Sequence, residues 1–265
     1  MCRLLGYCSR DAASVAELLG TESFRAFTSL SDLHGDGWGM AWYAGSRPAA
    51  WKSAARAGGE PGYDKLAWQP LGDLGLVHLR WATPGLPVTD VNTHPFQYGD
   101  YTFAHNGAIH PQERLGEMLP PDWERRLAGT TDSERYFLHL MWRLAERDGD
   151  VIAAIADTTA DIAGRYAPNS LNAILLAPGM LYAISWHDPD RIPREQLRKR
   201  GLGDRPEDIE AYFDLSYTET AGAVVVASSG WPMAGWTPLP RQHVLAVDQA
   251  TQAVSLIPIP AGVAS

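Results

Sequence analysis

The chain has 265 residues, of which 45% are hydrophobic and 20% charged, and its formal net charge at pH 7 is -9. This acidity argues against nucleic acid or an anionic membrane as a partner, because both select basic surfaces. The sequence has no apolar run of the roughly 20 residues that a membrane-spanning helix needs, and no secretory signal. We therefore expect a cytoplasmic protein that forms a single domain over residues 1–265 and acts on a small molecule.

The first predicted element is a strand at residues 2–8, with the sequence CRLLGYC. A short helix is expected near residues 12–19, with Ser9 or Asp11 as its N-cap and Gly20 at its end. The strand begins with a cysteine directly behind the initiator methionine. That placement is the most informative feature of the sequence.

Paired strands are predicted next. The turn-rich HGDGWG at residues 34–39 leads into the apolar MAWY and, after a polar segment, into residues 49–52. Because these glycines precede a strand pattern and not a helix, a dinucleotide-binding loop is disfavoured. Residues 74–81 and 101–105 predict two further strands, and both end in polar residues at a loop, where functional sites are commonly built.

The central part of the chain predicts two helices. One should start at TDSE, residues 131–134, and run to about Arg147 with an apolar stripe of helical period, and a second is expected near 151–165. Strands should follow at residues 170–177, 180–186, 222–228, 242–247 and 253–259. Strands, two helices and strands again indicate an α+β layered protein.

Removal of Met1 would give Cys2 a free α-amine beside its thiol. A thiolate is a nucleophile, and an N-terminal amine has an ordinary pKa of roughly 7.7–8.0, so a useful fraction is unprotonated near neutral pH. The amine could then accept the thiol proton, as in enzymes with an N-terminal threonine. The alternative is that Cys2 is an ordinary buried residue.

Six segments, in their order and spacing, resemble class II glutamine amidotransferase domains over about residues 1–145, and the rest of the chain does so more faintly. The six segments are MCRLLGY at 1–7, HGDGWGMAWY at 34–43, HLRWATPG at 78–85, NTHPF at 92–96, AHNGAI at 104–109 and TDSE at 131–134. The resemblance implies the N-terminal nucleophile hydrolase fold, a four-layer αββα sandwich of two antiparallel sheets. It also implies cleavage of the side-chain amide of glutamine, with Cys2 attacking the γ-carbonyl.

Asn106 and Gly107 are the predicted oxyanion donors, through a side-chain amide and an unhindered backbone N–H. Alone, an Asn-Gly pair would more simply be a tight turn. Preceded by a strand and matching the family's HNG, it is assigned with Cys2 to the catalytic group. Gly35, Gly37 and Gly39 could form a backbone wall near Cys2, although a plain turn explains them as well.

Arg80 is the candidate for the α-carboxylate of the substrate, since a guanidinium binds a carboxylate in a bidentate manner. A surface salt bridge is the alternative. Trp81 and Thr83 belong to the segment that lines the glutamine pocket in the family, although strand alternation turns Trp81 away from Arg80. The family's aspartate implies that Asp132 holds the α-ammonium, while its position in a capping box suits a purely structural role too.

No metal or other cofactor is expected. The eight histidines lack a metal-binding spacing, and the two cysteines form no CxxC motif. Cys2 and Cys8 would lie about 20 Å apart on one strand, too far for a disulfide. His94 and His105 are expected to brace the loops that carry the site.

Three functions remain open from the sequence. The chain could be a glutaminase that supplies ammonia to a separate synthase subunit, because the residues after the matching region read as more of the same sheet and leave no room for a synthase domain. It could instead hydrolyse another γ-glutamyl amide, as a stand-alone relative does in ergothioneine biosynthesis. The third alternative is a non-catalytic module that binds glutamine for regulation.

Overall fold

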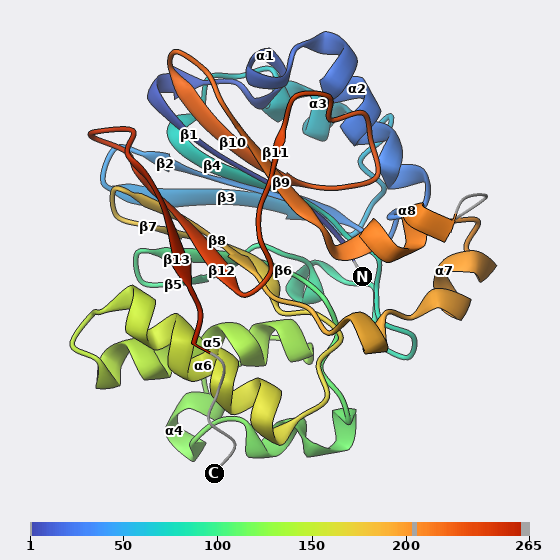
Figure 1. The fold of residues 1–265 in the computed structure, drawn as a ribbon, viewed down its shortest axis with the longest axis vertical. Coiled ribbons are helices and arrows are strands. Elements are labelled where there is room, and N and C mark those ends of the chain that lie inside the picture. Colours follow the sequence, from blue (N-terminus) through green and yellow to red (C-terminus); the bar gives the residue numbers. More distant parts are fainter. Residues whose placement is uncertain (1, 203–205, 261–265) are drawn as a thin grey trace.

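Two antiparallel sheets stack face to face at the centre of the molecule (Figure 1). The computed structural model describes residues 2–202 and 206–260. Within these residues one sheet has the strand order β11-β9-β10-β1-β4-β2-β3, and the other has the order β13-β12-β8-β7-β6-β5. Neighbouring strands in both sheets pair in antiparallel fashion.

The bounds of the strands follow for each sheet. The first sheet contains β1 (Arg3–Ala13), β2 (Trp38–Ala44), β3 (Arg47–Ser53), β4 (Gly72–Leu79), β9 (Leu215–Glu219), β10 (Ala223–Ser228) and β11 (Thr237–Pro238). The second contains β5 (Phe96–Tyr98), β6 (Tyr101–Asn106), β7 (Asn172–Ala177), β8 (Met180–Ser185), β12 (His243–Asp248) and β13 (Val254–Pro258). The predicted strands are thus confirmed, including the run after residue 170.

Helices cover the outer face of each sheet, which confirms the predicted αββα sandwich (Figure 1). The first sheet is covered by α1 (Val15–Leu19), α2 (Thr21–Ser29) and α3 (Pro61–Ala67). The second is covered by α5 (Asp132–Glu146) and α6 (Val151–Arg165), with the short α4 (Pro121–Glu124) packed against α5. Two more short helices, α7 (Arg194–Lys199) and α8 (Pro206–Glu210), lie at the end of the sandwich where β1 begins.

The alternation of side chains along β1 explains why this strand is buried on both faces. Leu4 and Cys8 belong to the core between the two sheets, whereas Leu5 and Tyr7 belong to the core beneath α1, α2 and α3. Successive side chains of a strand point to opposite faces, so a continuous apolar run fits a strand covered on both sides. β1 is therefore held at the centre of its sheet, between β10 and β4.

The helix predicted from residue 131 begins as expected. Thr131 is its N-cap, and its hydroxyl oxygen accepts a hydrogen bond from the Glu134 backbone N–H. The Glu134 carboxylate does not return to Thr131 but accepts hydrogen bonds from the backbone of Ala128 and Gly129. The capping box is therefore only half formed, because Glu134 fixes the preceding loop instead.

The predicted start of the first helix was wrong. β1 extends to Ala13, which pairs with Gly72 beyond an irregularity, and α1 starts at Val15 with Ser14 as its N-cap. Ser9, one of the two predicted caps, instead donates its hydroxyl proton to the backbone oxygen of Asp11. The strand pairing outweighs the local helix signal, and Gly20 ends the helix as expected.

Three buried histidines lie close to the junction of the two sheets. His78 on β4 reaches across to β6, where its Nε2 lies 3.3 Å from the His105 carbonyl oxygen. The His94 ring stacks 4.1 Å from the His78 ring and has no hydrogen-bond partner for either nitrogen among the described residues. Burial lowers the pKa of His78 to about 3 and that of His105 to about 4, and it holds the pKa of His94 well below its usual range. All three rings are therefore neutral in the folded protein at neutral pH.

These histidines should make the fold sensitive to acid. In the unfolded chain a histidine binds a proton below its ordinary pKa of about 6.5, whereas the buried rings do not, so stability falls as the pH drops below 6.5. Each ring should cost about 2 kcal/mol between pH 7 and pH 5. His94→Phe should therefore lose about 2 kcal/mol less of its free energy of unfolding than the wild type between pH 7 and pH 5. Urea unfolding at both pH values would measure this difference. An equal loss in variant and wild type would contradict this account.

Candidate active site

The start of β1 and the end of β6 meet at one point, although they belong to different sheets. The backbone nitrogen of Cys2 donates a hydrogen bond of 2.6 Å to Oδ1 of Asn106, the last residue of β6. Cys2 is 5% exposed and Asn106 is fully buried. The two predicted catalytic residues are thus brought together across 104 positions of sequence.

The other end of the Asn106 side chain has no partner. Its Nδ2 is buried and donates no hydrogen bond among the described residues. A buried amide N–H without an acceptor costs roughly 1–3 kcal/mol, so such a group in a native site calls for an explanation. Because Oδ1 is held by Cys2, the amide is oriented with its donor free.

Gly107 owes its identity to close packing. A Cβ at this position would lie 2.0 Å from the Ser170 carbonyl oxygen and 2.6 Å from His105 Nε2. No other residue type fits there without moving the backbone, whereas the positive φ of a tight turn is not found at Gly107. The turn interpretation of Asn106-Gly107 is therefore wrong, because the glycine permits the segment after β6 to approach Ser170, just before β7.

Side chains from distant segments fix the loop that follows Gly107. Ala108 N–H donates to Asn169 Oδ1 at 2.8 Å, and Ile109 N–H donates to Asp132 Oδ2 at 2.8 Å. Asp132 is the first residue of α5 and is 3% exposed, and among the described residues its Oδ1 has one polar contact, with the Ser133 hydroxyl at 3.5 Å. Asp132 thus holds the loop with one oxygen.

His105 braces the site, as predicted. Its Nδ1 lies 2.9 Å from the Ser133 hydroxyl, and its Nε2 lies 3.0 Å from the Ser170 carbonyl oxygen. A carbonyl oxygen only accepts, so Nε2 carries the proton and the neutral ring accepts from Ser133 at Nδ1. His94 supports its loop differently, since its ring packs against His78 and Phe96.

Arg80 is buried beside the cysteine. Its guanidinium donates to the backbone oxygens of Asp36 and Pro87, at 3.4 and 3.1 Å, and it forms no ion pair among the described residues. Among the described residues, Arg80 therefore does not form the surface salt bridge that was the alternative to a role in substrate binding. Burial lowers the pKa of Arg80, while the charges of Cys2, Asp36 and Asp132 raise it, so these groups lie within electrostatic reach of one another.

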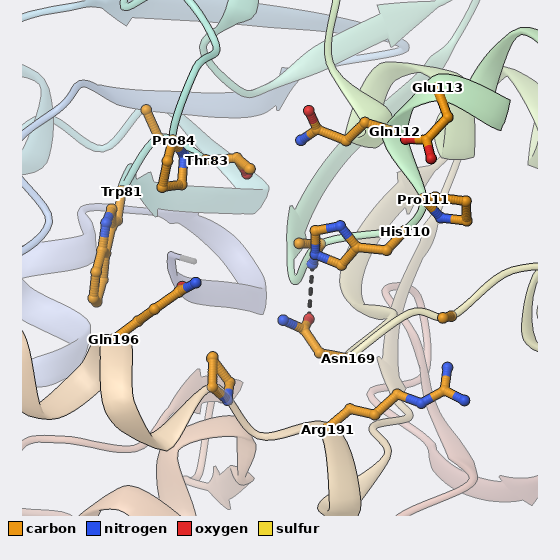
Figure 2. A pocket seen from close by; sticks show the side chains of 14 residues that line it. Trp81, Thr83, Pro84, His110, Pro111, Gln112, Glu113, Asn169, Arg191 and Gln196 are labelled. Carbon is orange, nitrogen blue, oxygen red and sulfur yellow. Dashed lines mark hydrogen bonds between the residues drawn. The ribbon is translucent and has the colours of Figure 1, made fainter.

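A cavity of about 630 Å³ opens beside the segment that follows Arg80 (Figure 2). Trp81 and Thr83 line one wall, and the Trp81 backbone oxygen lies 3.7 Å from Cys2 Sγ. The other predicted site residues do not line the cavity, namely Cys2, Arg80, Asn106, Gly107 and Asp132. The other lining residues are Ala82, Pro84, Ala108, His110, Pro111, Gln112, Glu113, Ala167, Asn169, Arg191, Pro193 and Gln196.

Sequence reasoning missed several residues that build the site. Asn169 orients the loop at Ala108 and turns its amide nitrogen into the cavity (Figure 2). Asp36 accepts from the Ala82 backbone, and the Ser228 hydroxyl accepts from the Leu4 backbone. Asp36 lies in the recognised glycine-rich segment and could have been inferred. Asn169 lies in a loop without any local signal of its own.

Metal and membrane signatures are absent from the parts of the chain that the structure covers, residues 2–202 and 206–260. There, no three His, Cys, Asp or Glu side chains are placed to hold a metal ion. No helix in the same ranges combines the length and apolar character needed to cross a bilayer. Cys2 and Cys8 are both free, in line with the expected separation.

The family described as glutamine amidotransferases class-II matches residues 1–254. The chain belongs to this family. The resemblance inferred from the six segments is therefore confirmed, and it extends well past residue 145. The expectation of one domain over residues 1–265 stays a prediction.

Two relatives show how far the similarity extends along the chain. The gamma-glutamyl-hercynylcysteine sulfoxide hydrolase of Mycobacterium tuberculosis is 26% identical over 258 residues, which cover 94% of both chains. The glutamine–fructose-6-phosphate aminotransferase (isomerizing) of Pseudomonas aeruginosa is 35% identical over 129 residues, which cover 48% of this chain and 18% of that enzyme. The chain thus matches one relative along nearly its whole length and the other over a fraction of it.

Solved structures share the fold. The glutamine aminotransferase class-II domain protein from Silicibacter pomeroyi has a TM-score of 0.64 at 19% identity, with 97% of this chain and 99% of that one covered. The glutamine phosphoribosylpyrophosphate amidotransferase from B. subtilis has a TM-score of 0.62 at 16% identity, with 98% and 49% covered. The N-terminal nucleophile hydrolase fold expected from the resemblance is confirmed.

Gly107→Ala should damage both stability and activity. The added methyl group meets a backbone carbonyl, so the loop must move, and overpacking of this kind costs about 1–3 kcal/mol. Gly164→Ala is the matched control, because its Cβ meets nothing within 4 Å and lies in α6, where alanine should stabilise by about 0.5–1 kcal/mol. Chemical unfolding would measure the stability of both variants. Unchanged stability in Gly107→Ala would contradict the packing argument.

Proposed function

We propose that the chain is an amide hydrolase that cleaves the γ-amide of glutamine or of a γ-glutamyl amide with Cys2 as the nucleophile. The observation that carries the proposal is the dual use of Asn106. Its oxygen holds the nitrogen of Cys2, and its buried Nδ2 is left with nothing to donate to among the described residues. An oxyanion formed at a carbonyl attacked by Cys2 would supply that acceptor.

The reaction follows from this geometry once Met1 has been removed. The α-amine of Cys2 accepts the thiol proton, and the sulfur attacks the γ-carbonyl carbon. Asn106 Nδ2 and the Gly107 N–H stabilise the resulting oxyanion. The C–N bond then breaks, the leaving amine takes the proton from the α-ammonium, and a thioester remains. Water, deprotonated by the same amine, hydrolyses the thioester to release glutamate and the free thiol.

The glutamyl part of the substrate would be held by the two buried charges near Cys2. Arg80 uses two of its five N–H groups on backbone oxygens, which leaves donors for an α-carboxylate. Asp132 keeps Oδ1 available for an α-ammonium, because only Oδ2 is occupied by a backbone N–H. Trp81 and Thr83 form the adjoining wall of the cavity.

The cavity favours a specific version of this function, hydrolysis of an amide whose leaving group is larger than ammonia. Ammonia needs no pocket, whereas about 630 Å³ beside Trp81 and Ala108 is enough for a substituent of considerable size. The M. tuberculosis relative, matched over 94% of its length, is named as a hydrolase of gamma-glutamyl-hercynylcysteine sulfoxide. Ammonia release from glutamine, compared with glutamate release from γ-glutamyl amino acids, separates this version from a glutaminase that serves a synthase subunit.

Covalent labelling tests the nucleophile. A diazo-ketone analogue of glutamine should add once to a protein that has lost the mass of Met1, and Cys2→Ala should remain unlabelled in intact-mass spectra. Cys8→Ala is the control and should label like wild type, because burial raises the pKa of the Cys8 thiol to about 11 and keeps it unreactive. A wild-type protein that retains Met1 and takes no label would instead indicate a glutamine-binding module without catalysis.

Asn106→Ala should give a folded protein with little activity. Loss of one oxyanion donor typically lowers the rate by about 10²–10³. Steady-state kinetics would show the loss in kcat, and thermal unfolding would show whether the fold persists. A variant with the wild-type kcat would remove Asn106 from the proposed oxyanion site.

A further inference from the structure

A guanidinium is buried next to the nucleophile and is not used by the mechanism above. Arg3, the first residue of β1, is 1% exposed. Its NH1 donates to the Tyr212 backbone oxygen at 2.8 Å, and its Cζ lies 4.0 Å from the centre of the Tyr212 ring. Its Nε is buried and has no partner among the described residues.

This cation has no anion beside it. Within residues 2–202 and 206–260 no carboxylate lies within ion-pair distance of Arg3. Arginine stays protonated in proteins, and burial of an unpaired charge is one of the largest penalties a fold can carry. A carbonyl oxygen and an aromatic ring compensate for only part of that penalty.

The polar neighbours of Arg3 are neutral. His34 Nδ1 lies 2.7 Å from the Leu30 carbonyl oxygen and so carries the proton, which leaves Nε2 to accept from the Tyr212 hydroxyl at 3.0 Å. Burial lowers the pKa of His34 and raises that of Tyr212, so neither ring is charged at neutral pH. No resident group of this cluster balances the guanidinium.

The cluster also contacts the nucleophile. The His34 ring packs against Trp81 at 5.8 Å and stacks on Tyr212 at 6.2 Å, and the Trp81 backbone oxygen is the contact of Cys2 Sγ. Burial lowers the pKa of Arg3, while Tyr212 and Cys2 oppose that shift, so Arg3 and Cys2 lie within electrostatic reach of each other. The one negative charge that the reaction creates in this region therefore forms where Arg3 can act on it.

We propose that Arg3 is the resident countercharge for the negative charge that develops on Cys2 Sγ and on the oxyanion. This inference rests on the proposed function. Arg3 touches no substrate and is a positioning residue that acts through Cys2. A buried cation favours the thiolate and the oxyanion over their neutral forms, which extends the reaction of Cys2 to lower pH. The alternative role is purely structural, an anchor for the segment at Tyr212.

The pH dependence of Cys2 alkylation by iodoacetamide separates the two roles, with Cys8→Ala as the background. Arg3→Met removes the charge and every donor, Arg3→Gln removes the charge and keeps an amide donor near the position of Nε, and Arg3→Lys keeps the charge. In the Met and Gln variants the pH of half-maximal labelling should rise by about one unit, which is about a tenfold slower reaction at pH values well below the wild-type midpoint. The Lys variant should retain the wild-type midpoint.

Wild-type midpoints in both uncharged variants would overturn the countercharge role, whatever their thermal stability. If Arg3→Met fails to fold, Arg3→Gln decides, because it removes the charge and keeps a polar donor in the buried space. A wild-type protein that keeps Met1 or is not alkylated at Cys2 overturns the proposed function itself, and the role of Arg3 with it. The Arg3 variants thus test the countercharge role, whereas the wild-type protein tests the proposed function.

Discussion

The hydrogen bond between the Cys2 nitrogen and Asn106 Oδ1 is the constraint on which the site depends. It joins the first strand of one sheet to the end of a strand in the other, so the stacking of the two sheets sets the position of the nucleophile. The surrounding contacts serve the same geometry. Gly107 lets β6 approach Ser170, and Asn169 and Asp132 fix the loop beyond it. Cys2 is thereby held in a buried site.

The charges around this bond follow a simple pattern. The histidines at the sheet junction are neutral because they are buried, and the hydrogen bonds of His105 fix its tautomer. Two guanidiniums, of Arg3 and Arg80, lie near Cys2 without an ion pair among the described residues. A buried and positively charged environment strengthens the attraction for any negative charge formed there. Substrate binding and catalysis would draw on the same imbalance.

Much of this arrangement was predictable because the signals were local. The strand at residues 2–8, the helices from 131 and 151 and the later strands all carry strong periodic or capping patterns, and the motif segments indicated Cys2, Asn106 and Gly107. The start of α1 was not predictable, since the pairing of Ala13 with Gly72 is a tertiary effect. β5 has three residues and β9 has five, too few for a clear period.

The sequence identified candidate residues of the site but did not show how their side chains contact one another. That Asn106 would use its oxygen on Cys2, that Asn169 would hold Ala108, and that Arg3 would be buried without an anion all depend on contacts between distant segments. The wall of the cavity formed by Arg191 and Gln196 likewise comes from a part of the chain without recognised motifs.

The most direct measurement is a crystal structure of the protein after reaction with the diazo-ketone analogue of glutamine. Our account predicts that Cys2 is the first residue, that its sulfur carries the adduct, and that the adduct oxygen lies about 2.7–3.1 Å from Asn106 Nδ2 and the Gly107 nitrogen. An adduct oxygen directed away from both donors, or a first residue still blocked by Met1, would contradict it.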